Sequence, residues 1–344
     1  MTLNATAKPR IAVFGAGAIG CYIGGCLAHS GATVVMIGRE RVKTVLREHG
    51  LHLTDWRGRD QRVTAGAITF SCDPADLAAA NIVLVTVKSG DTATAAAAIA
   101  GHTRPDALIV SFQNGVRNLE VLQQHLPDHN VLPGMVPFNV VNAERGHFHC
   151  GTEGNLALQG HQGLEAPLVT ALATAELPTD VYTNISSVQW SKLIMNLSNA
   201  INALAGVPLL EQLNNRRYRR VMAACIREAL RTARAAGIKP ARTGKVIPAL
   251  LPGILSLPTW AFRKVAAGIL AIDPNARSSM YDDLHRKRKT EIDFLNGEVV
   301  RLAQQLQLET PVNESIVALI KQAEQAQSGS PKITAEELAD RVLA

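Results

Sequence analysis

The hydrophobic pattern near the start of the chain alternates between short apolar runs and helical spacing. Residues 10–14 are mostly apolar, a glycine-rich turn follows, and residues 19–30 carry apolar side chains at helical spacing up to Gly31. Residues 33–37 are β-branched or apolar. These segments predict a strand, a helix that ends at Gly31 and a second strand. Such a β–α–β unit builds a parallel sheet.

The same alternation continues beyond this first unit. Residues 82–87 and 107–112 are apolar runs that predict buried strands, and the alanine-rich residues 92–100 predict a helix between them. Short extended pieces with Gly and Pro follow over residues 131–158. We expect antiparallel strands there, which close the domain.

The spacing changes near residue 185, after which it is almost only helical. A chain of 344 residues is long enough for two domains. We therefore predict a Rossmann-type α/β domain over residues 1–185 and an all-helical domain over residues 186–344. The first belongs to the α/β class, doubly wound with a mostly parallel sheet.

Composition narrows the class of protein. Hydrophobic residues make up 47% of the chain and charged residues 19%, which is typical of a globular protein, and no apolar run reaches the roughly 20 residues that cross a membrane. The five cysteines are an odd number at wide spacing, which favours reduced thiols and a cytoplasmic location. The net charge of +6 suits anionic ligands, such as a phosphorylated cofactor and a carboxylate substrate.

The glycine-rich turn is the first candidate site. Residues 15–20 have the pattern G-x-G-x-x-G after a predicted strand and before a predicted helix, which is the context of a dinucleotide site. Gly15 allows the tight turn, Gly17 lets the backbone approach the pyrophosphate, and Gly20 lets the helix pack on the strand. The predicted cofactor-binding residues of this turn are Gly15, Gly17, Ala18, Ile19 and Gly20.

The end of the second predicted strand bears on the choice of cofactor. An NAD enzyme usually carries an acidic residue there, which accepts hydrogen bonds from the ribose. This chain carries Arg39, which favours the 2′-phosphate of NADP(H). The adjacent Glu40 leaves NAD(H) open.

Further motifs follow in a characteristic order. They are Val-Thr-Val-Lys-Ser at 85–89, Phe-Gln-Asn-Gly at 112–115, Trp-Ser-Lys-Leu-Ile-Met-Asn at 190–196, Ser-Ser-Met at 278–280 and Thr-Glu-Ile-Asp-Phe-Leu-Asn-Gly at 290–297. Together with the glycine turn, their order and spacing over residues 10–320 resemble the ketopantoate reductase (2-dehydropantoate 2-reductase) family. The resemblance implies NADPH-dependent reduction of ketopantoate to pantoate, a step of coenzyme A biosynthesis.

The resemblance also implies roles for residues of the Rossmann domain. Lys88 and Asn114 correspond to the family's lysine and asparagine that line the cleft for cofactor and substrate. Both follow the carboxyl ends of predicted strands, where open α/β sheets bind ligands.

In the helical domain the resemblance makes Lys192 the catalytic acid. Asn196 and Asn199 follow on the same helical stripe and are the predicted substrate ligands. The family often carries an asparagine eight residues after the lysine, where this chain has Ala200. Asn199 is nearer than Asn202 to the direction of Lys192, so we take Asn199 as the substitute.

Two more site residues lie downstream. Leu284, Glu291, Leu295 and Leu302 share one predicted helical stripe, and a carboxylate on an apolar stripe needs a partner. In the family the residue at Glu291 binds the substrate hydroxyl in the catalytic site, and the residue at Ser279 contacts the substrate carboxylate. Ser279 also fits a helix N-cap.

A histidine- and cysteine-containing segment and two basic runs are the remaining candidates for a functional site. His147, His149 and Cys150 have no fourth ligand at a known spacing, so we predict no metal. The basic runs at 216–220 and 285–289 are predicted to be solvated helix faces rather than a nucleic-acid site.

Alternatives to the family function remain open at this point. One is a reductase of another small 2-oxo acid or ketone, and another is a non-catalytic NADPH-binding regulator. The apolar helices of the second domain leave a homodimer open.

Overall fold

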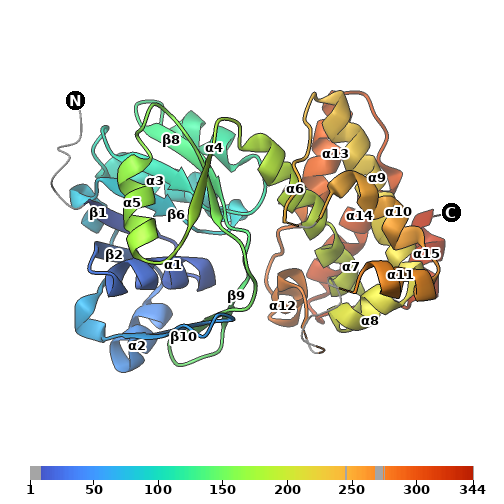
Figure 1. Ribbon diagram of the computed structural model, residues 1–344, viewed down its shortest axis with the longest axis horizontal. Helices are drawn as coiled ribbons and strands as arrows, with labels where there is room; N and C mark the ends of the chain where they lie inside the picture. The colour runs from blue at the N-terminus through green and yellow to red at the C-terminus, as the bar shows by residue number, and fades with distance from the viewer. Residues whose placement is uncertain (1–8, 245, 268–273, 275, 344) are drawn as a thin grey trace. The chain divides into compact units, whose positions relative to one another are not determined.

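A computed structural model describes residues 9–244, 246–267, 274 and 276–343 of the chain (Figure 1). The chain divides into two compact units between Ile185 and Ser186.

The first unit is built on an eight-stranded sheet in the order β12-β11-β8-β7-β6-β1-β2-β5. Every pair from β5 to β8 is parallel, whereas β11 runs antiparallel to β8. This confirms the predicted α/β class with a mostly parallel sheet. The strands are β1 (Arg10–Phe14), β2 (Thr33–Ile37), β5 (Thr69–Ser71), β6 (Ile82–Val85), β7 (Leu108–Ser111), β8 (Asn130–Met135), β11 (Leu156–Gln159) and β12 (Thr179–Tyr182).

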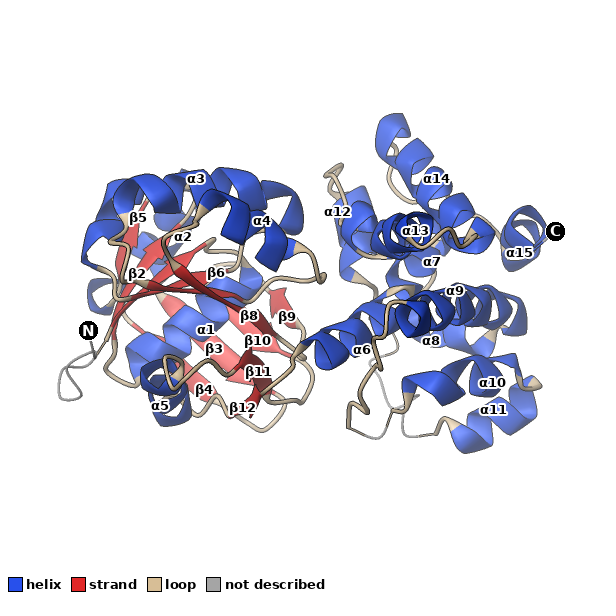
Figure 2. Ribbon diagram, turned by 90° about the horizontal axis from the view of Figure 1, so that it is seen from above, coloured by secondary structure: helices blue, strands red, loops and turns tan. Residues whose placement is uncertain are grey.

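Helices cover both faces of this sheet (Figure 2). The helices α1 (Ala18–His29) and α5 (Ala166–Thr174) contribute to the core on one face, and α3 (Thr92–His102) and α4 (Asn118–His125) to the core on the other. Successive residues of β1 alternate between the two cores, so that Ile11 and Val13 enter the first and Ala12 the second. Strands buried on both faces read as continuous apolar runs, which is why they were recognisable in the sequence.

A smaller sheet has the order β4-β3-β10-β9. Its strands are β3 (Leu51–Asp55), β4 (Asp60–Val63), β9 (Val140–Asn142) and β10 (His147–Cys150), and the helix α2 (Glu40–His49) precedes β3 in the chain. The prediction of antiparallel strands over residues 131–158 holds for β9 with β10 and for β11 with β8, but β8 and β10 also have parallel neighbours. β8 pairs parallel with β7 in the main sheet, where five of its six residues are buried, and β10 pairs parallel with β3 in the smaller sheet.

The second unit consists of helices and connecting segments among its described residues, which confirms the all-helical prediction. The helices are α6 (Ser186–Asn196), α7 (Ser198–Ala205), α8 (Leu209–Asn214), α9 (Arg216–Ala235), α10 (Leu251–Ser256), α11 (Thr259–Val265), α12 (Ser279–His285), α13 (Asn296–Gln305), α14 (Pro311–Ala326) and α15 (Ala335–Leu343). The long helix α9 contacts α10, α13, α14 and α15 and so forms the centre of the unit. None of the described helices is long and apolar enough to span a membrane.

One buried arginine attaches the segment around α10 and α11 to α9. Arg219 is completely buried, and its guanidinium donates hydrogen bonds to the carbonyl oxygens of Leu213, Leu255 and Leu257 at 2.8 to 3.1 Å. It also lies 4.3 Å from the ring centre of Phe262. We had expected the basic run at 216–220 to be a solvated face of a helix. The burial of Arg219 shows that this expectation holds only for part of the run.

Candidate functional site

Two glycines of the turn after β1 are required by the packing of the chain itself. Gly15 has φ +113°, and a Cβ at this position would lie 2.6 Å from the backbone nitrogen of Val87. A Cβ at Gly20 would lie 2.3 Å from the carbonyl oxygen of Gly15. The turn therefore packs directly against the end of β6, and α1 packs directly against the turn.

Gly17 differs from these two. It is exposed, and the nearest atom to an added Cβ is 4.0 Å away, so nothing in the described part of the chain requires a glycine here. Gly17 is the N-cap of α1, whose first residues Ala18 and Ile19 are half-buried. A helix N-terminus beside open backbone is suited to a phosphate group, so these residues fit the pyrophosphate of a dinucleotide.

Arg39 lies at the surface between β2 and α2. Its side chain is 74% exposed, and its Nη2 lies 3.8 Å from Oδ2 of Asp91, itself 57% exposed. Exposed ion pairs of this kind stabilise a fold little. The neighbouring Glu40 accepts a hydrogen bond from the thiol of Cys72 at 3.0 Å. The Arg39 guanidinium is therefore the group at this strand end that is suited to a phosphate.

Lys88 and Asn114 follow the adjacent strands β6 and β7, and both are exposed. The hydroxyl of Ser89 donates a hydrogen bond of 2.8 Å to the carbonyl oxygen of Asn114, which joins the two loops. Buried polar side chains lie directly beneath this contact, among them Gln113 and Asn118. Sequence reasoning missed them, although a glutamine directly after the apolar run 107–112 was a signal.

In the second unit, Lys192 and Asn196 lie one turn apart on α6, and both are half-buried. Burial lowers the pKa of Lys192 from 10.5 to about 8. Asn199 belongs to the next helix, α7, but Leu197 between them keeps helical angles (φ −58°, ψ −26°), so the predicted polar stripe continues. A lysine whose pKa is near neutrality is able to donate a proton at physiological pH.

Ala200 and Asn202 are more deeply buried than Asn199. Ala200 and Asn202 are completely buried. The amide nitrogen of Asn202 donates to Val207 and Gln212, and its Oδ1 accepts from the backbone N–H of Ser278. Asn202 is thus occupied in the fold, whereas Asn199 is half-buried and keeps exposed surface.

The N-cap of α12 is Ser278 and not Ser279, which corrects the prediction. The hydroxyl of Ser278 accepts a hydrogen bond from the N–H of Tyr281 at 3.1 Å and donates one to the carbonyl oxygen of Asn199 at 3.0 Å. Ser279 is the first residue of α12 and is exposed. A role as N-cap therefore does not account for a serine at position 279.

The helical stripe predicted through Glu291 is also wrong. The helix α12 ends at His285, Lys287 has φ +54°, and a 3₁₀ turn, η5 (Ile292–Phe294), precedes α13. The N–H and hydroxyl of Thr290 both donate to Glu324 at 2.7 Å, and these bonds fix the segment that connects α12 to α13. Glu291 is half-buried in the connection.

The basic run at 285–289 was expected to lie on a helix, and this expectation is wrong because most of the run belongs to the loop between α12 and η5. Only His285 of this run belongs to a helix, and the other four residues lie in the loop. A left-handed residue such as Lys287 interrupts helical periodicity without any change in the apolar pattern.

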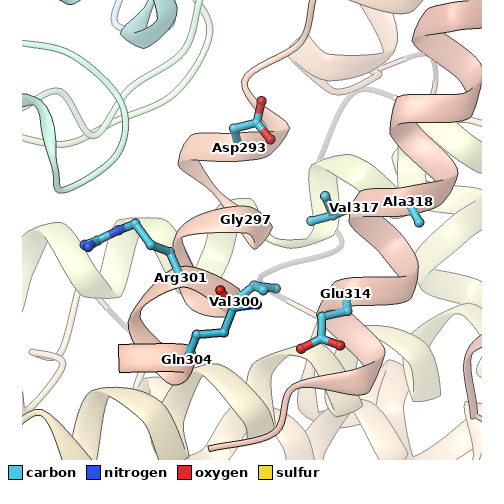
Figure 3. Close-up of a pocket in the computed structure, with 8 residues that line it drawn as sticks. All are labelled: Asp293, Gly297, Val300, Arg301, Gln304, Glu314, Val317 and Ala318. Carbon is cyan, nitrogen blue, oxygen red and sulfur yellow. The ribbon is translucent and has the colours of Figure 1, made fainter. Parts of the chain in front are cut away.

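A cavity of about 310 Å³ lies between α13 and α14 (Figure 3). Residues of both signs of charge line it, including Asp293, Arg301 and Glu314. None of the predicted site residues is among its lining residues.

The histidines of the small sheet are occupied by hydrogen bonds. Nε2 of His147 and Nδ1 of His149 each lie 2.8 Å from the hydroxyl of Thr54, and the ring of His52 stacks on His147 at 4.4 Å. Within the described part of the chain, no group of three or more potential ligands is placed to hold a metal ion.

Comparison with known proteins gives the family. The family model described as "Ketopantoate reductase PanE/ApbA" matches residues 11–163, and the model of its C-terminal part matches residues 184–324. The chain belongs to the ketopantoate reductase family. This is a family of oxidoreductases.

Individual relatives match nearly the whole chain. The 2-dehydropantoate 2-reductase of Halobacterium salinarum is 29% identical over 321 residues, which are 92% of this chain and 99% of the relative. The structure of a PanE/ApbA family ketopantoate reductase from Ralstonia eutropha JMP134 is 31% identical with a TM-score of 0.79, over 92% of this chain and 99% of the other. A D-mandelate dehydrogenase solved with NADH and anilino(oxo)acetate shares the fold at 20% identity and a TM-score of 0.77, over 92% of this chain and 99% of the other.

Proposed function

We propose that the protein reduces 2-dehydropantoate to pantoate with NADPH as the hydride donor. The observation that carries the proposal is Lys192, half-buried on α6 one turn before Asn196, with its pKa lowered to about 8. A proton donor is what the reduction of a ketone requires, because hydride addition leaves negative charge on the carbonyl oxygen.

Bound NADPH supplies the hydride to the ketone carbon. The ammonium group of Lys192 stabilises the alkoxide as it develops and donates the proton that makes it a hydroxyl. The amide side chains of Asn196 and Asn199, which follow Lys192 along the helical stripe, are suited to hydrogen bonds with the substrate's oxygens. Glu291 accepts from the substrate hydroxyl, and the exposed Ser279 hydroxyl donates to the substrate carboxylate.

The cofactor-binding roles belong to the first unit. The turn at Gly15, Gly17 and Gly20 with the start of α1 takes the pyrophosphate, and Lys88 and Asn114 take the nicotinamide end at the carboxyl edge of the sheet. The exposed guanidinium of Arg39 takes the 2′-phosphate, because its ion pair with Asp91 is long and solvated and so is easily replaced.

The proposal is tested by following the loss of NADPH absorbance in the near ultraviolet with ketopantoate as substrate. NADH and a series of other 2-oxo acids are run in parallel. Turnover that prefers ketopantoate and NADPH supports the proposal. Tight NADPH binding without turnover of any 2-oxo acid would contradict it and favour a regulator.

A second candidate is a reductase of another small 2-oxo acid. The specific observation in its favour is Ala200, which is apolar and completely buried where the family often carries an asparagine. Faster turnover of another 2-oxo acid than of ketopantoate would decide for this candidate. The role in coenzyme A biosynthesis depends on the first outcome, and the homodimer stays a prediction.

A further inference from the structure

The ends of three neighbouring strands, β1, β6 and β7, are joined by side-chain hydrogen bonds. The hydroxyl of Thr86 donates to the carbonyl oxygen of Gly15 at 2.7 Å, and the amide of Gln113 donates to the carbonyl oxygen of Val87 at 3.1 Å. These bonds lie outside the backbone ladder of the sheet. They therefore fix the loops at the carboxyl edge and not the strands themselves.

The bonds between the loops after β6 and β7 meet at one buried hydroxyl, that of Thr92. Oγ1 of Thr92, 1% exposed, lies 2.9 Å from both the carbonyl oxygen of Ser89 and Oδ1 of Asn118, and it accepts from Nε2 of Gln113 at 2.8 Å. Ser89, Gln113 and Asn118 are also buried. We call these four residues, Ser89, Thr92, Gln113 and Asn118, the loop clamp.

The loop clamp acts on the backbone of Asn114. Nδ2 of Asn118 donates to the carbonyl oxygen of Asn114 at 2.6 Å, and the Ser89 hydroxyl donates to the same oxygen at 2.8 Å. Lys88 directly precedes Ser89 in the chain. The backbones that carry Lys88 and Asn114 are thus held by one set of buried bonds.

We propose that Thr92 and Asn118 are positioning residues for the reduction, because through the loop clamp they fix Lys88 and Asn114 against the nicotinamide and the ketone. This inference rests on the proposed function for its reaction. Neither side chain needs to touch a ligand. Positioning of this kind matters because small displacements of reacting groups lower rates strongly.

The chain offers a matched pair of substitutions at the two ends of α3. Thr92→Val removes the central hydroxyl of the loop clamp. Thr103→Val, at the other end of the helix, removes a hydroxyl that donates to Ile99 and contacts His129. Both changes replace threonine by valine beside the same helix. Thr92→Ser keeps the hydroxyl, and Asn118→Asp keeps the shape but replaces the donor.

We expect Thr92→Val and Asn118→Asp to lower kcat at least about 10-fold, and Thr103→Val to change it less than about 2-fold at a similar loss in Tm. Thr92→Ser should keep most of the activity. Equal kcat values in Thr92→Val and Thr103→Val at equal Tm would overturn the inference.

If the proposed function is wrong, the experiment gives a result that differs from failure of the loop clamp. In that case the wild-type protein does not turn over ketopantoate, and the loop clamp is tested by the Kd for NADPH, measured by fluorescence. A weaker Kd in Thr92→Val than in Thr103→Val supports the clamp, and equal values contradict it.

Discussion

The hydroxyl of Thr86 donates a hydrogen bond of 2.7 Å to the carbonyl oxygen of Gly15, and the same glycine has no room for a side chain. The end of β6 and the turn after β1 are therefore one rigid piece of backbone. Gly17 is only two residues further along the chain, yet it has open space beside it. Gly15 is required by the packing of the fold, whereas Gly17 leaves space for a ligand, and substitution should distinguish these two roles.

Alanine substitution should distinguish Gly15 from Gly17. Gly15→Ala places a Cβ against the backbone of Val87 at a positive φ, and we expect it to lower the free energy of unfolding by about 2 kcal/mol or more. Gly17→Ala should change it by less than about 0.5 kcal/mol but weaken NADPH binding at least about 10-fold. Urea unfolding and fluorescence titration measure the two effects. A normal Kd for NADPH in Gly17→Ala would contradict the pyrophosphate role.

Removal of the Lys192 amine should abolish proton donation. We expect Lys192→Ala to lower kcat by about 10²–10⁴-fold while the Kd for NADPH stays close to the wild-type value. The wild-type rate of ketone reduction should fall as the pH rises through about 8, because the ammonium form is lost there. A pH profile of kcat/KM checks this, and a flat profile across that range would exclude Lys192 as the acid.

Lys192 should also affect stability with a definite sign. Its pKa is lowered in the folded chain from 10.5 to about 8, so between these values the unfolded chain holds a proton that the folded chain lacks. Stability from this group therefore rises with pH across that window, and below it the buried charge is a cost. Lys192→Met should be more stable than the wild type at about pH 7, and the difference should shrink by about pH 10. Urea unfolding at both pH values tests this, and a less stable Met variant at about pH 7 would show that Lys192 is well paired there.

Arg39 should set the preference between the two cofactors. We expect Arg39→Ser to raise the KM for NADPH at least about 10-fold with little change for NADH, because only NADPH has a 2′-phosphate. Asp91→Asn is the matched control, since it removes the ion-pair partner of Arg39 and leaves the guanidinium in place. That variant should bind NADPH as well as the wild type or better. An equal loss for both cofactors in Arg39→Ser would point to a structural effect.

Arg219 should be a major stabilising residue of the helical unit. Arg219→Leu removes the donor from the buried carbonyl oxygen of Leu255 and from the partly buried carbonyl oxygens of Leu213 and Leu257, and a buried group left unpaired costs about 1–3 kcal/mol. We expect a loss of at least about 3 kcal/mol in the free energy of unfolding. Faster proteolysis between α10 and α11 should accompany it. Unchanged proteolysis there would show that other contacts hold the segment on α9.

The sequence predicted those parts of the fold that depend on neighbours along the chain. The strands β1 and β2 have the predicted bounds because their apolar runs are continuous and end at a glycine turn. The stripe through Glu291 failed because Lys287 turns to a left-handed conformation, which no apolar spacing records. The loop clamp was not predictable, since Thr92 and Asn118 are 26 residues apart and meet only when β6 and β7 pair.

The burial of Ala200 has a consequence for engineering this chain. Its side chain is completely buried in α7, and the neighbouring Asn202 already holds three hydrogen bonds of the fold. An asparagine at position 200 would need both additional volume and a polar partner, so one substitution that restores the common family residue would first weaken the protein. An engineered asparagine at position 200 therefore requires that the side chains around Ala200 be repacked together with the substitution itself.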